Sequence, residues 1–124
     1  MEAILNCTPH EAAIYTGCLY DPKTGNYVGG EPVMIFPPCG SVATAVSAIS
    51  AMDPLDLDGI PVPCCKRKFA SITKLPGGAD MYIVSSVYAQ AAAELGEDTS
   101  KLLVPYGTVK RGGQTVGCTG LIQN

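Results

Sequence analysis

The sequence contains few charged residues. Only 15% of its 124 residues are charged, whereas 47% are hydrophobic. Because so few charges leave apolar surface to be covered, we expect the chain to associate with further copies of itself as a homo-oligomer. The length is enough for one hydrophobic core, so we expect a single domain over residues 1–124.

Positive charge is especially scarce. The formal net charge is −3 and the sequence pI is about 4.9. Basic residues form only two runs, Lys66–Lys68 and Lys110–Arg111. A protein that binds a nucleic-acid backbone needs a basic face. We therefore expect no nucleic-acid partner.

Long apolar runs are missing as well. No stretch reaches the roughly 20 residues that a helix needs to cross a bilayer. The N-terminal residues 1–6 contain no positive region followed by an apolar one. We expect neither a membrane partner nor a signal peptide, and a cytoplasmic location. Because a cytoplasm keeps thiols reduced, we expect free and mostly buried cysteines. The six cysteines are Cys7, Cys18, Cys39, Cys64, Cys65 and Cys118.

The usual cofactor and metal motifs do not occur. Neither G-x-G-x-x-G nor G-x-x-x-x-G-K-[ST] is present, so the common dinucleotide and triphosphate sites are excluded. The aspartates of residues 53–59 lack the spacing and the final glutamate of a calcium loop. A zinc site could draw on Cys7, His10 and the pair Cys64–Cys65, but adjacent cysteines lack C-x₂-C spacing. We expect no metal and no cofactor.

The most informative stretch that is present runs from Met81 to Gly96. Residues 81–84 are a short apolar run rich in strand formers, which is typical of a strand covered on both faces. Ser85 and Ser86 follow as candidate N-caps. The spacing predicts a helix over about 86–95 with an apolar face. Gly96 is suited to end that helix. The expected apolar face comprises Val87, Ala91 and Leu95, with Tyr88 beside them.

The remainder predicts short strands and turns around this unit. We expect strands at 3–6, 12–15, 33–36, 60–65, 68–72, 102–104, 108–110 and 116–122, with the 33–36 strand buried. A turn at 21–26 connects the two strands of a hairpin, and a tight turn lies at 111–114. Residues 40–52 fit either a thin helix or a strand followed by a loop or short helix, and 53–59 fits a loop. The fold class expected is α+β: a small mixed, mostly antiparallel sheet or open barrel with one main helix.

The single histidine lies in a polar segment, Asn6–Glu11, where the first strand breaks at Thr8-Pro9. Asn6, Thr8 and His10 together offer many hydrogen-bonding groups. His10 could be a general base or a ligand contact, because its unperturbed pKa lies near neutrality. Alternatively, Asn6 and Thr8 satisfy loop backbone groups and His10 stabilises the turn. A Cys–His nucleophilic pair using Cys39 or Cys7 is a further alternative, although no nucleophile elbow surrounds either cysteine.

A second set of polar residues suits a phosphate group. Ser85 and Ser86 lie at a helix N-terminus, where free amides favour an anion. Ser41 follows another strand end, and Lys110 with Arg111 occupies a glycine-rich turn. Together with Asn6, Thr8 and His10, these residues are our candidate ligand-binding set. The alternative is that the serines are helix caps and the basic pair is a solvated turn.

Four segments, taken in order, resemble a family of small phage and prophage proteins without an assigned activity. Members of that family begin with a strand and N-L-T-P-H, which corresponds to Asn6–His10. A P-P-S-G segment corresponds to Pro37–Gly40, and Y-I-V-S corresponds to Tyr82–Ser85. The V-G-C-x-x-L ending corresponds to Val116–Leu121. The resemblance spans nearly the whole chain.

The chain departs from that pattern at three positions. Cys7 stands where leucine is usual, and Cys39 stands where serine is usual. Thr44 lies in the region where a basic residue often follows the P-P-S-G segment.

The resemblance implies a phage-type accessory protein in a host bacterial cytoplasm. We expect it to bind and sequester a small phosphorylated, nucleotide-derived signalling ligand of anti-phage defence, without catalysis. One alternative is a small metal-independent nucleotide phosphodiesterase or ring nuclease that uses His10. Another is a protein-binding inhibitor of a host factor, with the apolar surface as its interface.

Overall fold

The computed structural model describes residues 3–123, which form ten strands and one helix. The elements, in chain order, are β1 (Ile4–Asn6), β2 (Ala12–Thr16), β3 (Leu19–Asp21), β4 (Asn26–Val28), β5 (Glu31–Phe36), β6 (Ala45–Leu57), β7 (Ile60–Ile72), β8 (Met81–Ile83), α1 (Ser86–Glu94), β9 (Leu102–Arg111) and β10 (Gln114–Gln123).

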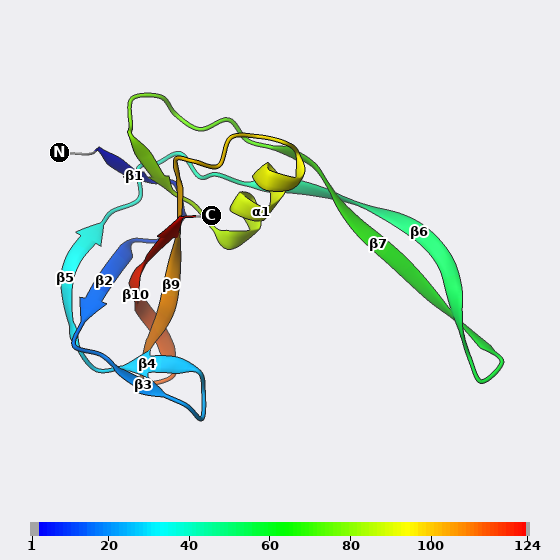
Figure 1. Ribbon diagram of the computed structural model, residues 1–124, viewed down its shortest axis with the longest axis horizontal. Helices are drawn as coiled ribbons and strands as arrows, with labels where there is room; N and C mark the ends of the chain where they lie inside the picture. Colours follow the sequence, from blue (N-terminus) through cyan, green and yellow to red (C-terminus); the bar gives the residue numbers. More distant parts are fainter. Residues whose placement is uncertain (1–2, 124) are drawn as a thin grey trace.

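The molecule has two parts, which Figure 1 shows as a curled sheet and a long projecting hairpin. We call the first part the body. Its strands follow the order β1-β8-β9-β10-β2-β5, and the β3–β4 hairpin joins through β4 to β9. An isolated bridge between Asn6 and Pro38 links the two ends of this path, so the sheet curls toward an open barrel.

The expected fold class is correct at its coarse level: a mixed sheet with one main helix. The molecule is richer in strand than α+β implies. Four of the eight strand pairings among residues 3–123 are parallel, but the antiparallel pairings join many more residues. Two of the parallel pairs arise because β1, β8 and β9 run side by side in one direction. Their connections cross over instead of forming tight hairpins.

Helix α1 begins and ends as the sequence predicts. The Oγ of Ser85 accepts a hydrogen bond of 3.1 Å from the amide of Tyr88, which satisfies a free donor of the first turn. Gly96, with φ of 77°, follows the last turn in the left-handed region. The predicted strand before the helix is also confirmed, because Tyr82 and Ile83 are buried.

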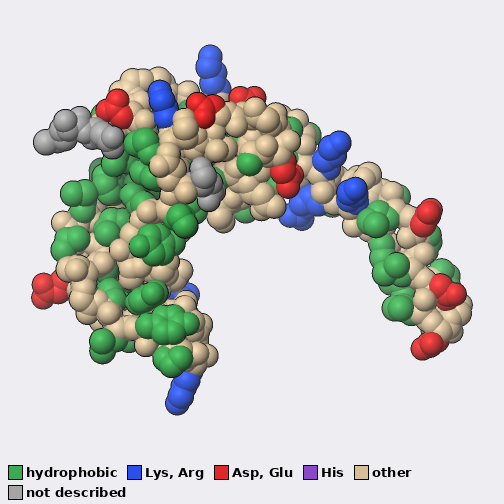
Figure 2. Space-filling view, in the orientation of Figure 1, with side chains coloured by type: hydrophobic (Ala, Val, Ile, Leu, Met, Phe, Trp, Pro, Cys, Tyr) green, Lys and Arg blue, Asp and Glu red, His purple; other side chains and the backbone are tan. Residues whose placement is uncertain are grey.

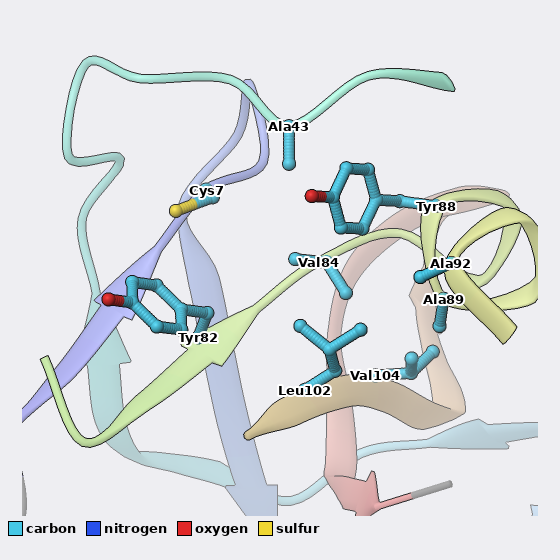
Figure 3. Packing of buried hydrophobic residues seen from close by; sticks show 9 residues of the cluster. All are labelled: Cys7, Ala43, Tyr82, Val84, Tyr88, Ala89, Ala92, Leu102 and Val104. Carbon is cyan, nitrogen blue, oxygen red and sulfur yellow. The ribbon is translucent and has the colours of Figure 1, made fainter. Parts of the chain in front are cut away.

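The face that α1 buries agrees with the expected one only in part. Tyr88 and Ala91 are buried as expected, whereas Val87 and Leu95 are exposed and the helix buries Ala89 and Ala92 in their place. The small alanines let the helix approach the sheet closely, which a stripe of larger residues would prevent. Figure 3 shows the resulting cluster. Its members are Cys7, Ala43, Tyr82, Val84, Tyr88, Ala89, Ala92, Leu102 and Val104.

The second part is the ribbon of β6 and β7, two antiparallel strands of 13 residues each, which we call the arm. At about 3.3 Å per residue it extends for roughly 40 Å. Its base meets α1, where the Tyr88 hydroxyl donates to the carbonyl of Thr73 at 2.7 Å. The rest projects away from the body (Figure 1).

The arm corrects several predictions. Residues 53–57 continue β6 instead of forming a loop, and the turn shrinks to Asp58–Gly59. The two strands expected at 60–65 and 68–72 are one strand, β7, which pairs with β6 and not with itself. For residues 40–52 the strand alternative is correct from Ala45 onward. Local sequence did not reveal this because Pro54 and the three aspartates resemble a loop, whereas long-range pairing overrides that tendency.

Strand β5 corrects another expectation. Its side chains were expected to be buried, yet Val33, Met34 and Ile35 are all about half exposed or more. β5 is the last strand of the sheet path and no element of the described chain covers it. An uninterrupted apolar run therefore lies on the outer surface of the body.

Candidate functional site

A hollow of about 620 Å³ opens at the body where the segment after β1 meets β2, β9 and β10. This size falls within the range of small-molecule sites in proteins. Its lining comprises Thr8, His10, Glu11, Ala12, Ala13, Pro105, Thr108, Thr115, Val116, Gly117 and Cys118. Two of the predicted ligand-binding residues, Thr8 and His10, are among them.

Asn6 organises the turn that carries His10. The side chain is buried, and its Nδ2 donates at 2.8 Å to the carbonyls of His10 and Phe36. Its Oδ1 accepts from the amide of Thr8 at 3.0 Å and from the Thr8 hydroxyl at 2.6 Å. Asn6 therefore has the structural role given above as the alternative, and it positions Thr8 and His10, which line the hollow, without lining the hollow itself.

The Asn6 network leaves the His10 imidazole free for other contacts. The Thr8 hydroxyl also lies 2.8 Å from the His10 carbonyl, so the backbone of His10 is held from two sides. The side chain of His10 is exposed and lines the hollow. Among residues 3–123 it has no hydrogen-bond partner. A fixed backbone with a free imidazole is a suitable geometry for a ligand contact.

The opposite wall comes from the β9–β10 hairpin. Thr108 and Thr115 contribute hydroxyls to the hollow, and the buried thiol of Cys118 lies behind them. Lys110 lies directly opposite Thr115 across the strand pair. Side chains that are opposite each other in an antiparallel pair share a face, so Lys110 lies on the same face as Thr115, at the rim just beyond the residues that line the hollow.

Gly117 lets this wall approach β2 closely. A Cβ at position 117 would lie 2.5 Å from the carbonyl oxygen of Ala13 and 2.6 Å from the ring of Tyr15. The register of the hairpin also shifts between Thr115 and Gly117, which is typical of a β-bulge. The glycine and the bulge together shape this wall of the hollow.

The remaining predicted residues lie elsewhere in a single chain. The Ser85 hydroxyl caps α1, Ser86 is the first residue of that helix, and Ser41 is in an exposed loop. None of the three lines the hollow.

The separation of Ser85 from Arg111 follows from the register of β9. Val84 donates to the carbonyl of Leu103 at 2.9 Å, so the end of β8 lies beside the start of β9. Arg111 ends β9, eight residues after Leu103, which corresponds to roughly 25 Å along a strand. The expectation that Ser85 and Arg111 face a common hollow is therefore wrong within one chain.

The charge inside the hollow is nearly balanced. Glu11 adds a carboxylate to the lining, whereas Lys110 contributes an ammonium at the rim and His10 an imidazole. An anionic ligand would therefore find hydroxyl and imidazole donors but little net positive charge from the chain that holds it.

Sequence reasoning missed a contact between two cysteines. The Sγ atoms of Cys7 and Cys39 lie 3.7 Å apart, and all six cysteines are free. Burial raises the pKa of the Cys7 thiol to about 12, and the neighbouring Cys39 adds to this effect. A thiol that resists ionisation is a poor nucleophile, so the geometry does not favour Cys7 as a catalytic partner of His10.

The expectation of mostly buried cysteines is wrong. Only Cys7 and Cys118 are buried, whereas Cys39 and Cys65 are exposed. The reason is that Cys65 lies on the projecting arm and Cys39 lies in the loop after β5, where little packs against either side chain.

A second hollow of about 370 Å³ lies between the base of the arm and α1. Tyr88, Ala92 and Leu102 form its apolar floor, and Lys74, Glu97 and Asp98 form its polar rim. Since two carboxylates face one ammonium there, this hollow suits an anionic ligand less well than the larger one.

Residues 3–123 contain neither a candidate metal site nor a helix that could cross a membrane, and the sequence has no significant match among known proteins. In that part of the chain no group of three or more His, Cys, Asp or Glu side chains could hold a metal ion. Among the same residues, no helix has the length and apolar character needed to cross a membrane. No protein-family model matches the sequence, and neither a curated protein nor a solved structure shows significant similarity to it.

Proposed function

We propose that this protein is a phage-type accessory protein that binds and sequesters a small phosphorylated, nucleotide-derived signalling ligand of bacterial anti-phage defence. The ligand site is the hollow formed by His10, Thr108 and Thr115 with Lys110 at its rim. The observation that carries the proposal is a hollow of about 620 Å³ lined by the His10 imidazole and the hydroxyls of Thr108 and Thr115, which make no hydrogen bonds among residues 3–123. The phage setting rests on the resemblance of four ordered sequence segments.

The chemistry of the hollow favours binding over turnover. Hydroxyls and a neutral imidazole can donate hydrogen bonds to phosphate oxygens and to the edges of a base. The adjacent thiol of Cys118 is buried, and burial raises its pKa, so it is unsuited to nucleophilic attack. The donor set that remains can hold a ligand without breaking it.

One enzymatic alternative has a specific observation in its favour. His10 and Glu11 both line the hollow, and an imidazole and a carboxylate can act as general acid and base. In that case the protein would be a small nucleotide phosphodiesterase or ring nuclease. Binding measurements alone would not separate the two functions.

Isothermal titration calorimetry tests binding, with cyclic AMP, cyclic di-AMP and ADP-ribose as probes. We expect at least one probe to bind, and we expect His10→Ala and Thr115→Val each to weaken it by about tenfold. Thr16→Val is the matched control, because Thr16 ends β2 outside the hollow. Absence of heat for all three probes would count against the proposed function.

A second measurement separates sequestration from catalysis. The protein is incubated with a probe that binds, then denatured, and the released material is separated by chromatography. Recovery of the intact probe supports sequestration. Products that vanish in His10→Ala would instead establish the enzymatic alternative.

A further inference from the structure

The arm exposes more apolar surface than its own chain covers. Large side chains along it are between 50% and 66% exposed: Val46, Ile49, Met52, Leu55, Leu57 and Ile60. A two-stranded ribbon alone is marginally stable in water. Contiguous apolar patches of this kind on soluble proteins usually mark an interaction surface. The arm therefore has the properties of a docking element.

The apolar side chains near the tip lie on one face. Leu57 is directly opposite Ile60, and Leu55 is directly opposite Val62. Because opposite residues of an antiparallel pair point to the same side and alternate residues share a face, these four side chains are neighbours. Figure 2 shows hydrophobic side chains along the side of the distal arm that faces the body.

The same face changes character toward the base of the arm. Along β7, alternation carries the face from Ile60 and Val62 through Cys64 to Lys66 and Lys68. The opposite face carries Asp56 at the tip. One side of the arm is thus apolar in its distal half and basic in its proximal half.

Prolines decide how this arm can dock. Pro54, Pro61 and Pro63 lie in its distal half and have no amide hydrogen to offer to an added strand. Prolines at such positions are a common protection against edge-to-edge pairing. Docking therefore uses the side-chain face and not strand addition.

The body of the same chain carries a matching surface. Val33, Met34 and Ile35 of β5 form an exposed apolar run, and Glu31 at the start of that strand adds a negative charge. Ile35 is directly opposite Ala13, which lines the hollow, so this surface borders the candidate ligand site.

We propose that the arm of one copy docks on β5 of a second copy. Its apolar half covers residues 33–35, and its basic half lies beside Glu31. A second copy is the occupant because this chain carries both an apolar-and-basic face and an apolar-and-acidic one.

The docked arm approaches the hollow with its apolar half. Ile35 lies opposite Ala13, which lines the hollow, whereas Glu31 lies opposite Thr16, which does not. The basic half beside Glu31 therefore lies at the end of β5 that is far from the hollow, and the contact does not depend on the proposed function.

Light scattering coupled to gel filtration at micromolar concentration tests the assembly. We expect the wild-type chain to elute as more than a 12.8 kDa monomer. Leu57→Lys should weaken association by about tenfold or more. Asp56→Asn is the matched control, since it also raises the net charge by one, by removing a carboxylate on the opposite face. Its side-chain carbonyl can still accept the turn hydrogen bond from Gly59. A monomeric wild-type chain would overturn the proposal.

Photo-crosslinking locates the docking surface. With a benzophenone side chain at position 57, we expect adducts between two copies that map to residues 31–36. Met34→Lys should remove those adducts without changing the fold, because Met34 is exposed. Adducts found only between arms, or only with another protein in a lysate, would contradict docking on β5.

A charge variant tests the orientation of the docked arm. Lys66→Gln with Lys68→Gln should weaken association by about fivefold, because these side chains lie beside Glu31 of the neighbouring copy. Glu31→Gln should weaken it to a similar degree. Unchanged association in both variants would overturn the placement of the basic half. If the chain assembles but no probe binds, the proposed function fails while the arm contact stands.

Discussion

The body and the arm are both built from strands, yet they differ in what covers them. Ile83 at the end of β8 is fully buried, whereas Ile49 within β6 is 66% exposed. Backbone pairing forms either kind of strand, but burial requires a second layer. In the body α1 packs over the neighbouring Tyr82 and Val84 on one face of β8, and in the arm no element of the same chain supplies such a layer beyond the base.

This difference assigns separate roles to the two parts. The cluster beneath α1 stabilises the body whether or not another copy is present. The arm adds a ribbon whose apolar face stabilises only an assembly. The two parts are joined at Thr73, which exchanges two hydrogen bonds with Thr44 and accepts a third from Tyr88.

The largest expected effect compares two isoleucines. Ile83→Ala should lower the free energy of unfolding by about 2–5 kcal/mol, because it leaves a cavity in the packed body. Ile49→Ala should cost about 0.5 kcal/mol or less in a dilute monomer, because its side chain is already in water. Urea unfolding followed by circular dichroism measures both. Equal losses of unfolding free energy in the two variants would show that the arm is packed within its own chain.

The next prediction concerns the joint between the two parts. Tyr88→Phe removes the hydroxyl that donates to Thr73, leaving a part-buried carbonyl without that donor. We expect a loss of about 1 kcal/mol in the same assay. Tyr20→Phe is the control, because Tyr20 is an exposed tyrosine of β3. An equal loss of unfolding free energy in both variants would show that the hydrogen bond from Tyr88 to Thr73 does not specifically stabilise the joint.

Alkaline pH should destabilise the body and not the arm. Burial raises the pKa of Cys7 from 9.0 to about 12 and also raises the pKa of Tyr88 and Cys118. These groups ionise first in the unfolded chain, so their contribution is fully present below about pH 9 and is lost as the pH rises toward 12. Urea unfolding at mildly alkaline and strongly alkaline pH measures the loss. Cys7→Ala should flatten the profile, and an unchanged profile would contradict the assignment.

The smallest expected effect is a difference in thiol reactivity. Cys65 on the arm and Cys39 beside β5 are exposed, whereas Cys7 and Cys118 are buried in the body. We expect iodoacetamide to label the exposed pair first and the buried pair only after unfolding, because thiolate access limits the reaction. Mass spectrometry of digested protein reports the order. Early labelling of Cys7 would indicate that the body opens locally.

The sequence predicted best where the signal was local. Ser85 as the N-cap, Gly96 after the helix and the strand before it could be read from short-range rules, because caps and turns depend on a few adjacent residues. The buried face of α1 could not be predicted from such short-range rules. Spacing favoured Val87 and Leu95, but the sheet accepts the smaller Ala89 and Ala92.

Long-range pairing was the second limit. Nothing near Pro54 indicates that β6 continues to Leu57, because that stretch is held by residues of β7. For the candidate site, the Asn6–His10 segment was correctly expected to place polar groups together, and His10 does line the hollow. Thr108 and Thr115 were missed, since single threonines in a strand carry no motif that distinguishes them.

Hydrogen exchange at two protein concentrations tests most directly whether the arm is completed by a second copy. We expect amides of residues 45–72 to exchange fast in dilute protein and to become protected as the concentration rises. Amides of residues 81–92 should be protected equally at both concentrations, because the body is packed within one chain. An arm protected to the same degree in dilute and concentrated protein would contradict this account.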